Sequence, residues 1–406
     1  MPGFFTKKEL ADTAPLVGRK QSCTFCGLYK DCKTPKMEPY GDFKKKIMVI
    51  GEAPGELEDR RGKPWQGKTG QLLQATLDKL GINLFEDCIS LNAVNCRPID
   101  KHGNNATPTN QTIDCCRKSV LLAINKHKPK VILLLGNPAI NSVIGHRWKK
   151  DLGGITKWRG WTIPDQDFKT WICPTFHPSY VERADAKEVK TIWEQDLKQA
   201  IEKAKEKFPE YVEPTIETIT DLTVLNEIKS DFAFDYETTG LKPHGKGHRI
   251  VCCAIATSEN HAYTFMMPET RRERKAFIHL LANPHIGKIA QNMKFEDTWS
   301  RRLGVEAQSW AWDTMIASHI LDNRPGVTGL KFQVYVQFGI VDYASEVSSY
   351  FTTADRNANA INKIMELVST SEGRNKLLQY CGLDSVYEYR LYKKQKDLIL
   401  ETCLPF

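Results

Sequence analysis

The sequence predicts an α/β protein with more than one domain, and two stretches carry this prediction. In the first half, an apolar run at Ile47–Ile50 stops at Gly51, passes into an acidic, turn-rich loop and continues as a helical pattern from Gly67. In the second half, an apolar strand at 232–240 carries two acidic residues. A strand, a loop and a helix in this order are typical of α/β domains, whose ligands bind beyond the carboxyl ends of the strands. A length of 406 residues allows two or three such domains, each with its own core.

The composition limits the class of protein. A net charge of +8 with 26% charged residues fits a protein with acidic partners, nucleic acid among them. The sequence has neither a signal-peptide pattern nor an apolar run near the roughly 18 residues of a membrane span, so we expect no membrane partner. Without an export signal, the twelve cysteines are expected to be thiols and metal ligands rather than disulfides.

The boundary between the halves is expected near residue 210. A charged helical pattern runs from Glu188 to Phe208 and stops at Pro209, with Pro214 close behind. Proline ends helical patterns and is common in linkers. The predicted organisation is a polar lead-in at 1–20, a first domain at 21–208, a linker at 209–216 and a second domain at 217–406.

The N-terminal cysteines indicate a metal site of undecided type. Cys23 and Cys26 form a CxxC pair, and Cys32 follows six residues after Cys26. A CxxC pair alone fits a zinc site, a redox pair or an iron–sulfur cluster.

Several separated stretches of the first half resemble, in this order, the iron–sulfur (family 4-like) uracil-DNA glycosylases. The resemblance covers roughly residues 20–205, and its motifs lie at 46–73, 90–98, 108–116, 135–139, 159–160 and 174–180. It implies a uracil-DNA-glycosylase-like three-layer α/β/α sandwich. It also implies excision of uracil, in which the target base leaves the stack and enters a pocket that stacks it and reads its edge.

The resemblance assigns four residues to this chemistry. Trp65 is the stacking platform, and Asn92 reads uracil because one carboxamide can donate to O4 and accept from N3. Cleavage of the glycosidic bond leaves positive charge on the sugar and negative charge on the base. Glu52 is therefore expected to help the cation or orient water, and His177 to stabilise the departing uracil anion.

Three further features follow from the same resemblance. Glu58 is a weaker candidate for the contact with water. Pro178–Val181 is expected to form a loop that wedges into the duplex, with Arg183 near phosphate.

The resemblance also supplies partners for the CxxC pair. Cys96 and Cys116 join Cys23 and Cys26 as the four thiolate ligands of a [4Fe–4S] cluster. Cys116 is preferred to its neighbour Cys115 because the interval from Pro108 matches the family. Zinc and free buried thiols remain the alternatives, since zinc also accepts thiolates. For Cys32 we expect a structural role that ties two ends of the domain together, although it is also a possible substitute ligand.

The second half carries paired carboxylates. Asp235 and Glu237 are two residues apart, so on a strand both project from the same face. Buried carboxylates are costly unless they hold a cation, and oxygen ligands of this kind suit Mg²⁺ or Mn²⁺. Tyr380 and Asp384 share one face of a helix.

Together with the stretches at 291–297, 312–314 and 329–331, these residues resemble the DEDDy-type 3′–5′ exonucleases, in particular the proofreading domain of family A DNA polymerases. The resemblance spans roughly 215–400 and implies an RNase H-like fold. It implies that Asp235, Glu237 and Asp384 hold two Mg²⁺ or Mn²⁺ ions, which clamp the scissile phosphate, and that Tyr380 orients the attacking water. Glu296 takes the place where the family's second motif normally has aspartate, and Asp297 follows it.

We therefore predict a bifunctional enzyme of DNA repair or replication, which excises uracil with its first half and removes 3′-terminal nucleotides with its second. Its expected partner is DNA, single-stranded or locally opened. The expected location is the cytoplasm, at the nucleoid or with the replication machinery, and an origin in a virus of a bacterial host is compatible with it.

An alternative makes the first half a non-catalytic module that binds DNA or uracil. Attached to an active exonuclease, it would act as a part, subunit or partner of a DNA polymerase. Glu52, Asn92 and His177 favour the enzyme. Asn95, where relatives often have a basic residue, and the insertion at 101–105 favour the module.

Overall fold

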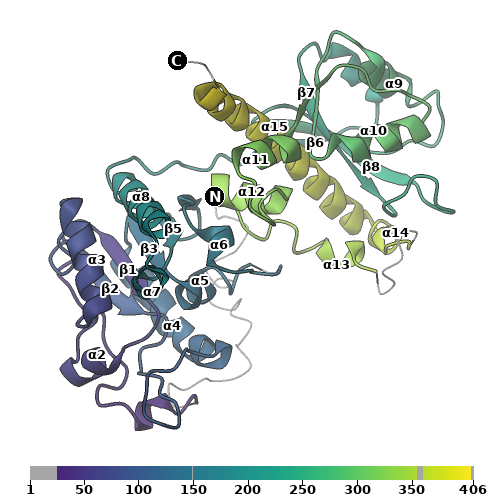
Figure 1. The fold of residues 1–406 in the computed structure, drawn as a ribbon. Coiled ribbons are helices and arrows are strands. Elements are labelled where there is room, and N and C mark those ends of the chain that lie inside the picture. Colours follow the sequence, from purple (N-terminus) through teal and green to yellow (C-terminus); the bar gives the residue numbers. More distant parts are fainter. Residues whose placement is uncertain (1–24, 149, 354–359, 404–406) are drawn as a thin grey trace. The chain divides into compact units, whose positions relative to one another are not determined.

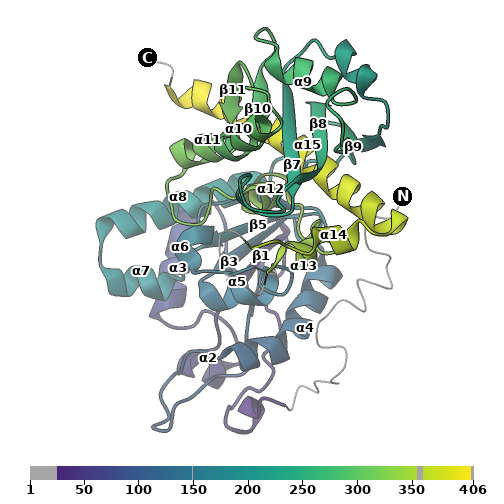
Figure 2. The same ribbon diagram turned by 90° about the vertical axis from the view of Figure 1, so that its right-hand side faces the viewer.

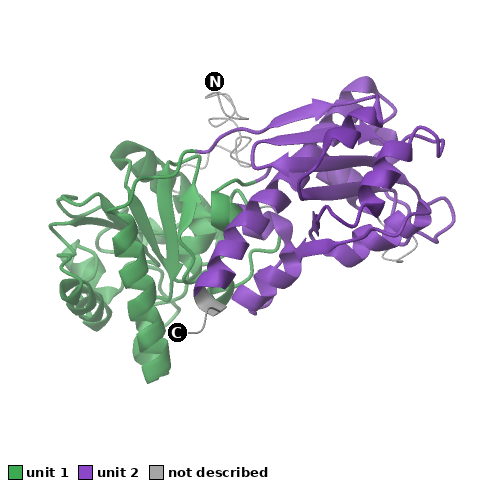
Figure 3. Cartoon of the chain, turned by 90° about the horizontal axis from the view of Figure 1, so that it is seen from above, with its two compact units in different colours: residues 1–210, 335–341 green, residues 211–334, 342–406 purple. Residues whose placement is uncertain are grey.

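The computed structural model describes residues 25–148, 150–353 and 360–403. The chain divides into two compact units, which Figure 3 shows in different colours. The first unit comprises residues 1–210 with 335–341, and the second comprises 211–334 with 342–406. Across the described ranges, no helix combines the length and the apolar character needed to cross a lipid bilayer.

The first unit is built on a five-stranded sheet in the order β2-β1-β3-β5-β4. The first four of these are parallel to one another, and β4 runs antiparallel to β5. Every residue of the four parallel strands is buried, as expected for strands that are covered on both faces. The strands are β1 (Ile47–Gly51), β2 (Cys88–Asn92), β3 (Val131–Leu135), β4 (Ile163–Asp165) and β5 (Thr170–Thr175).

Helices cover both faces of this sheet, which gives the predicted three-layer α/β/α sandwich. Ile47 and Val49 of β1 pack with Leu73 of α3 and Leu197 of α8 on one face. Figures 1 and 2 show α4 and α5 on the other face. The helical elements of the unit are η1 (Leu28–Lys30), α2 (Glu56–Arg61), α3 (Lys68–Lys79), α4 (Asn110–His127), α5 (Asn137–Val143), α6 (Ile155–Trp158), α7 (Pro178–Ala184) and α8 (Lys187–Lys203).

Two predictions about local structure in this unit were wrong. The segment Pro178–Val181 is the first turn of helix α7 rather than a loop, because proline is favoured at the start of a helix and His177 caps it. Val181 is buried in the core, so it cannot wedge into a duplex. The helical pattern predicted to reach Phe208 ends at Lys203, and the chain then turns so that Phe208 packs edge-on against Trp171.

The second unit is built on a six-stranded mixed sheet in the order β11-β10-β7-β8-β9-β6. Strands β7, β8 and β9 form an antiparallel meander, β10 and β11 extend it parallel to β7, and β6 pairs parallel with β9. The strands are β6 (Thr215–Thr218), β7 (Phe232–Thr238), β8 (Ile250–Ser258), β9 (His261–Met266), β10 (Lys288–Ala290) and β11 (Trp310–Asp313).

The alternation along β7 assigns its two faces to different helices. Phe232 and Phe234 pack with Phe277 of α9 and Trp299 of α10. Ala233 packs with Val386 of α15, the long helix drawn in yellow in Figure 1. Because side chains alternate along a strand, Asp235 and Glu237 face α15 as well. The helical elements are η2 (Leu222–Glu227), α9 (Lys275–Ala282), α10 (Met293–Arg302), α11 (Thr314–Leu321), α12 (Leu330–Phe338), α13 (Ser348–Phe351), α14 (Ile364–Leu367) and α15 (Ser371–Cys403).

Candidate active sites

A cavity of about 1330 Å³ opens at the carboxyl edge of the sheet in the first unit. Four parallel strands end there, and each supplies a wall residue at or just after its last position. These residues are Glu52 after β1, Asn92 of β2, Gly136 after β3 and His177 beyond β5. The parallel register, in which Gly51 pairs with Asn92, brings these positions to one edge.

The wall of this cavity that holds Trp65 depends on Gly51. A Cβ atom on Gly51 would lie 2.6 Å from Oδ1 of Asn92 and 2.9 Å from Cζ2 of Trp65, so only glycine fits. Trp65 is 6% exposed, and its backbone has a positive φ of 59°. Its indole Nε1 is buried and has no hydrogen-bond acceptor among the described residues.

Glu58 holds the loop that carries Trp65. Its Oε1 accepts hydrogen bonds from the backbone amides of Gln66 (2.7 Å) and Gly67 (2.9 Å), just before helix α3 begins. Glu58 also lines the cavity, but this oxygen is already occupied. The geometry therefore gives Glu58 a role in positioning the loop.

His177 is a neutral hydrogen-bond donor in this cavity. Burial lowers the pKa of its imidazole to about 4, and the positive charge of Arg183 adds to the effect. Nδ1 accepts from the backbone amide of Ser179 (3.3 Å) and lies 2.7 Å from the Ser179 hydroxyl. Because a backbone N–H can only donate, the proton of the neutral ring is on Nε2.

Glu52 and Arg183, two of the charged residues on the wall, have opposite signs. Burial raises the pKa of Glu52, and the positive charge of Arg183 partly opposes the shift. Both residues line the cavity, as does Trp65, whose ring centroid is 5.7 Å from that of His177. The cavity thus combines an anion, a cation, a neutral donor and an aromatic face.

A buried ion pair fixes the end of β5 just before His177. The Asp196 carboxylate accepts from Nε and Nη2 of Arg159 (3.0 and 2.6 Å) and from Oγ1 of Thr175 (2.7 Å). A carboxylate that accepts two parallel guanidinium bonds is held in a fixed orientation. Arg159, which the resemblance only placed in a motif, therefore anchors α8 to the strand that presents His177.

The structure gathers cysteines on the side of the first unit where η1 lies, but Cys23 lies outside the described residues. Cys96 is buried, its Sγ accepts from the backbone amide of Lys36 (3.2 Å), and the Cys32 thiol lies beside it. Burial raises the pKa of Cys96 to about 12. Cys116 is buried in a small cluster that includes Leu28, whereas Cys115 is partly exposed and Cys26 is half-buried.

The donor set on this side of the unit consists of thiols, the ligands that iron–sulfur clusters take and that zinc also accepts. Cys96 and Cys32 lie side by side, and Cys116 is buried. These residues therefore fit a thiolate-bound metal centre.

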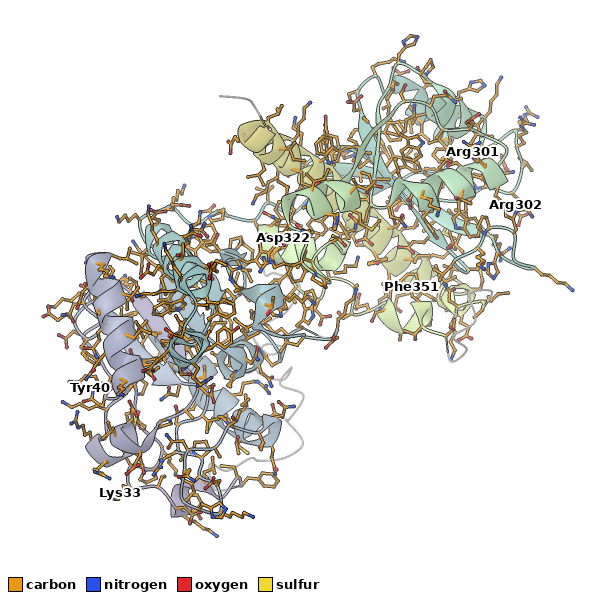
Figure 4. All side chains as sticks on the ribbon, in the orientation of Figure 1. Lys33, Tyr40, Arg301, Arg302, Asp322 and Phe351 are labelled. Carbon is orange, nitrogen blue, oxygen red and sulfur yellow. The ribbon has the colours of Figure 1, made fainter. Side chains whose placement is uncertain are left out.

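A second cavity, of about 360 Å³, lies in the second unit between β7 and α15. It is lined by Asp235, Glu237, Tyr380 and Asp384, and by Phe351 of α13, which is labelled in Figure 4. Carboxylate oxygens of Asp235 and Glu237 and the Sγ of Cys381 lie within 4.8 Å of one another, a spacing that suits a bound cation. Burial and the neighbouring charge of Asp384 raise the pKa of Asp235 well above its usual range.

Lys331, to which the sequence assigned no role, supplies the positive charge of this site. Its ammonium donates to Oδ1 of Asp384 and to the hydroxyl of Tyr343 (2.8 Å), which itself donates to the same oxygen (2.6 Å). The ammonium also lies over the rings of Tyr343 and Tyr380, 4.1 and 4.3 Å from their centroids. Lys331 thus partly neutralises the carboxylates.

Glu296, rather than Asp297, faces the acidic cluster. Glu296 is 2% exposed, and burial together with the charge of Asp235 raises its pKa well above the usual range. Its Oε2 has no hydrogen-bond partner among the described residues. The Asp297 carboxylate instead accepts from Nε of Arg301 (2.8 Å) on the exposed side of α10.

Glu388 is a further buried acid of this site that was not predicted from the sequence. This residue is fully buried, and neither carboxylate oxygen accepts a well-formed hydrogen bond from the described residues, although the backbone amide of Gln291 lies near enough to favour the charged form. Burial, then the charges of Asp235 and Glu296, raise its pKa well above the usual range. The signal was available in the four-residue spacing, which continues from Tyr380 and Asp384 along the same face of α15.

Comparisons with known proteins agree with this division. Residues 38–200 match the family model of the uracil DNA glycosylase superfamily, and residues 213–399 match that of the 3′–5′ exonucleases. The type-4 uracil-DNA glycosylase of Thermotoga maritima is 34% identical over 197 residues, which are 48% of this chain and 96% of the relative. The type-4 uracil-DNA glycosylase of Pyrobaculum aerophilum is 33% identical over 169 residues, which are 41% of this chain and 82% of the relative.

Similarities to the second unit are weaker. DNA polymerase I of Chloroflexus aurantiacus is 26% identical over 204 residues, which are 47% of this chain but only 20% of that protein. The solved structure of Brucella melitensis NrnC with bound Mg²⁺ has a TM-score of 0.32 and 20% identity, and covers 46% of this chain and 81% of its own. The relatives of the first unit are decisive: the chain belongs to the type-4 uracil-DNA glycosylases, and a 3′–5′ exonuclease domain follows its glycosylase domain.

Proposed function

We propose that the first unit excises uracil from DNA and that the second removes 3′-terminal nucleotides by metal-dependent hydrolysis. One observation carries the proposal: each unit gathers its own complete set of functional groups in its own cavity. Glu52, Asn92 and His177 line the first cavity, and three acidic residues with a tyrosine line the second. We propose domain limits of 21–208 and 217–406, joined by the linker at 209–216.

Base recognition in the first cavity rests on Asn92 and Trp65. Asn92 is 5% exposed at the end of β2 and lines the cavity. An amide can donate to O4 of uracil and accept from N3, a pattern that cytosine does not match. The Trp65 ring supplies the face on which the flipped base stacks.

Bond cleavage in this cavity uses groups whose charges match the reaction. As the glycosidic bond breaks, the base becomes an anion, and the Nε2–H of neutral His177 donates to its developing oxyanion. A neutral imidazole can do this without first losing a proton. The carboxylate of Glu52 stabilises the positive sugar or positions the attacking water, and Arg183 contacts phosphate.

We propose that Cys23, Cys26, Cys96 and Cys116 hold a [4Fe–4S] cluster, which when bound ties the N-terminal segment to the loop after β2 and to helix α4. Cys32, beside Cys96, is the thiol that can replace one of these ligands. Purified protein is expected to contain about four iron atoms and four sulfides per chain. Stoichiometric zinc without iron would contradict the cluster.

In the second unit, we propose that Asp235, Glu237 and Asp384 bind two divalent ions, Mg²⁺ or Mn²⁺, which when bound stabilise the attacking and leaving oxygens of the hydrolysis. Tyr380 orients the attacking water through its hydroxyl. Burial raises the pKa of Tyr380 well above its usual range, so the hydroxyl remains protonated and acts as a positioning group. Glu296 adds an outer carboxylate.

The proposed partner is single-stranded or locally opened DNA, and a DNA polymerase domain or subunit is the proposed further partner on the same strand. Such an enzyme would act in DNA repair or replication, in the cytoplasm at the nucleoid.

A single substrate tests both proposed activities. A 5′-labelled single strand with one internal uracil is incubated in EDTA, treated with alkali and run on a sequencing gel. Cleavage at the uracil is expected from the wild type and lost in His177→Ala. A ladder shortened from the 3′ end is expected only after Mg²⁺ is added, and should be absent in Asp235→Asn. A wild type that leaves the uracil intact in EDTA but trims in Mg²⁺ would make the first unit a binding module.

A further inference from the structure

A third cavity lies in the second unit and is not used by the chemistry above. Its volume is about 510 Å³, and it lies where β8 begins, β9 ends and α10 ends. We call it the arginine pocket and define it by the lining residues Arg249, Arg274, Arg302, Met266, Met365 and Trp299. Arg302 at the C-terminal end of α10 is labelled in Figure 4.

The charge of the arginine pocket favours an anion. Three guanidinium groups line it, and Glu269 is the carboxylate on its wall. Among the described residues, Arg249, Arg274 and Arg302 form no ion pair with a carboxylate. The Nε of Arg274 is buried and has no acceptor within the described chain, which is costly for a charged group. Guanidinium groups bind phosphate through paired hydrogen bonds.

Apolar and polarisable side chains form another part of the arginine pocket, beside Glu269 and His248. Met266 and Met365 contribute thioethers, and Nη2 of Arg249 lies 3.2 Å from Sδ of Met365. Trp299 also borders the pocket, and its side chain is fully buried. The thioethers of the two methionines favour contact with an aromatic ring. These groups favour a ligand that carries a planar base beside its phosphate.

A pair of hydrogen bonds and one turn of helix α10 connect the arginine pocket to the catalytic cavity. The backbone of Arg249 exchanges hydrogen bonds with Thr239: the Thr239 amide donates to its carbonyl (3.0 Å), and its own amide donates to Oγ1 of Thr239 (2.9 Å). Thr239 follows Glu237 by two residues. Along α10, Phe295 lines the catalytic cavity and Trp299, one turn later, lines the arginine pocket, with ring centroids 6.2 Å apart.

We propose that the arginine pocket binds a nucleotide of the strand upstream of the 3′ end, through its phosphate and base, while the end itself occupies the catalytic cavity. The inference rests on the proposed exonuclease function of the second unit. A free nucleoside monophosphate presents the same chemistry, so the test separates the two sources.

The test measures binding of a labelled, uracil-free single strand to the full chain carrying Asp235→Asn, so that no cleavage occurs. Fluorescence anisotropy at several salt concentrations gives the slope of log affinity against log salt. Arg249→Gln with Arg302→Gln is expected to weaken binding about tenfold and lower the slope by about 0.7, the value for one lost phosphate contact on single-stranded DNA. The matched control, Arg271→Gln with Arg272→Gln, removes the same charge from exposed positions outside the pocket and should change both quantities much less.

Kinetics with intact Asp235 sharpen the test. The double variant is expected to raise KM for a long strand about tenfold and leave kcat unchanged. Equal effects of the pocket and control pairs would overturn the proposal.

A third experiment tests whether the pocket binds a free nucleoside monophosphate instead of the strand. If deoxyadenosine monophosphate saturates the wild type and not the pocket variant, while KM for the strand is the same in both, the pocket serves free nucleotide and the proposal is wrong. Failure of the proposed exonuclease itself would appear separately, as wild-type protein that trims nothing in Mg²⁺ although the binding slopes remain measurable.

Discussion

The two cavities differ in the signs of the charges that line them. In the first, Glu52 and Arg183 carry opposite charges beside an imidazole that burial keeps neutral, and other charged residues also line the wall. In the second, burial and the charges of neighbouring acids raise the pKa of Asp235, Glu237, Glu296 and Glu388, and the ammonium of Lys331 contacts Asp384. The first site therefore mixes both signs of charge, whereas the second concentrates negative charge that the proposed divalent ions would offset.

The largest effect is expected for a substitution in the second cavity, which should abolish its activity and leave that of the first. Asp235→Asn removes a ligand from the proposed metal site, so nucleotide release from single-stranded DNA should fall by about a thousandfold or more. Uracil excision in EDTA should be unchanged. Parallel assays on the same preparation check both, and joint loss of the two activities would contradict separate sites.

At the first cavity, His177→Ala should lower kcat for uracil excision by about 100- to 1000-fold, the usual cost of losing a donor to a developing anion. Trimming in Mg²⁺ provides the control and should remain. Because the pKa of His177 is about 4, wild-type excision should not change through protonation of this ring as the pH falls from about 7 to about 5. An activity that rises as the pH falls through the ordinary histidine pKa would instead indicate a cationic imidazole.

The pH dependence of stability is also expected to differ between the two units. Burial raises the pKa of Asp235, Glu237, Glu296 and Glu388, so their contribution to the stability of the metal-free second unit is greatest below the ordinary carboxylate pKa of about 4. It is lost as the pH rises through the raised values. In EDTA, amide hydrogen exchange in α15 should therefore become faster with rising pH by more than the intrinsic exchange rate does. Adding Mg²⁺ should remove this extra acceleration.

Glu388→Met removes one buried acid of similar size from this cluster. It should stabilise the metal-free second unit by about 1–4 kcal/mol at alkaline pH and flatten the pH dependence. The exchange of β1 and β3 in the first unit is the internal control. A variant less stable than the wild type at alkaline pH would show that Glu388 has a partner in the folded state.

The smallest effect is expected for a conservative substitution of Trp65 in the first cavity. The Nε1 of Trp65 has no acceptor within the described chain, so Trp65→Phe removes an unsatisfied donor and keeps an aromatic face. We expect a change of less than about threefold in excision and a stability change within about 1 kcal/mol. Trp65→Ala, which removes the face, is the contrasting variant and should raise KM much further.

The fold class could be predicted because it depends on local patterns. The buried run at Ile47–Ile50 and the spacing of Asp235 and Glu237 identify strands and their faces directly, and the two-unit α/β architecture is confirmed. The loop expected at 178–181 followed from the family resemblance alone, and the structure has a helix there that begins at Pro178 and is capped by His177.

The parts of the sites that escaped prediction depend on contacts between distant segments. Lys331 and Tyr343 meet Asp384 only when α12 and the segment after it pack against α15, and nothing in their local sequence indicates a charged partner. Glu388 looks like an ordinary helix residue until the packing of α15 on the sheet shows that it is buried. Burial of this kind follows from tertiary structure.

The ammonium of Lys331 affects how a divalent ion would bind in the second cavity. Since it already hydrogen-bonds to Oδ1 of Asp384, a divalent ion that binds this oxygen enters by exchange, and the lysine side chain has to move aside. The net binding free energy of the metal ion is then its own interaction with the Asp384 carboxylate less the interaction that the lysine ammonium gives up. At the proposed metal site, the contact between Lys331 and Asp384 would therefore oppose the binding of a divalent ion to this carboxylate.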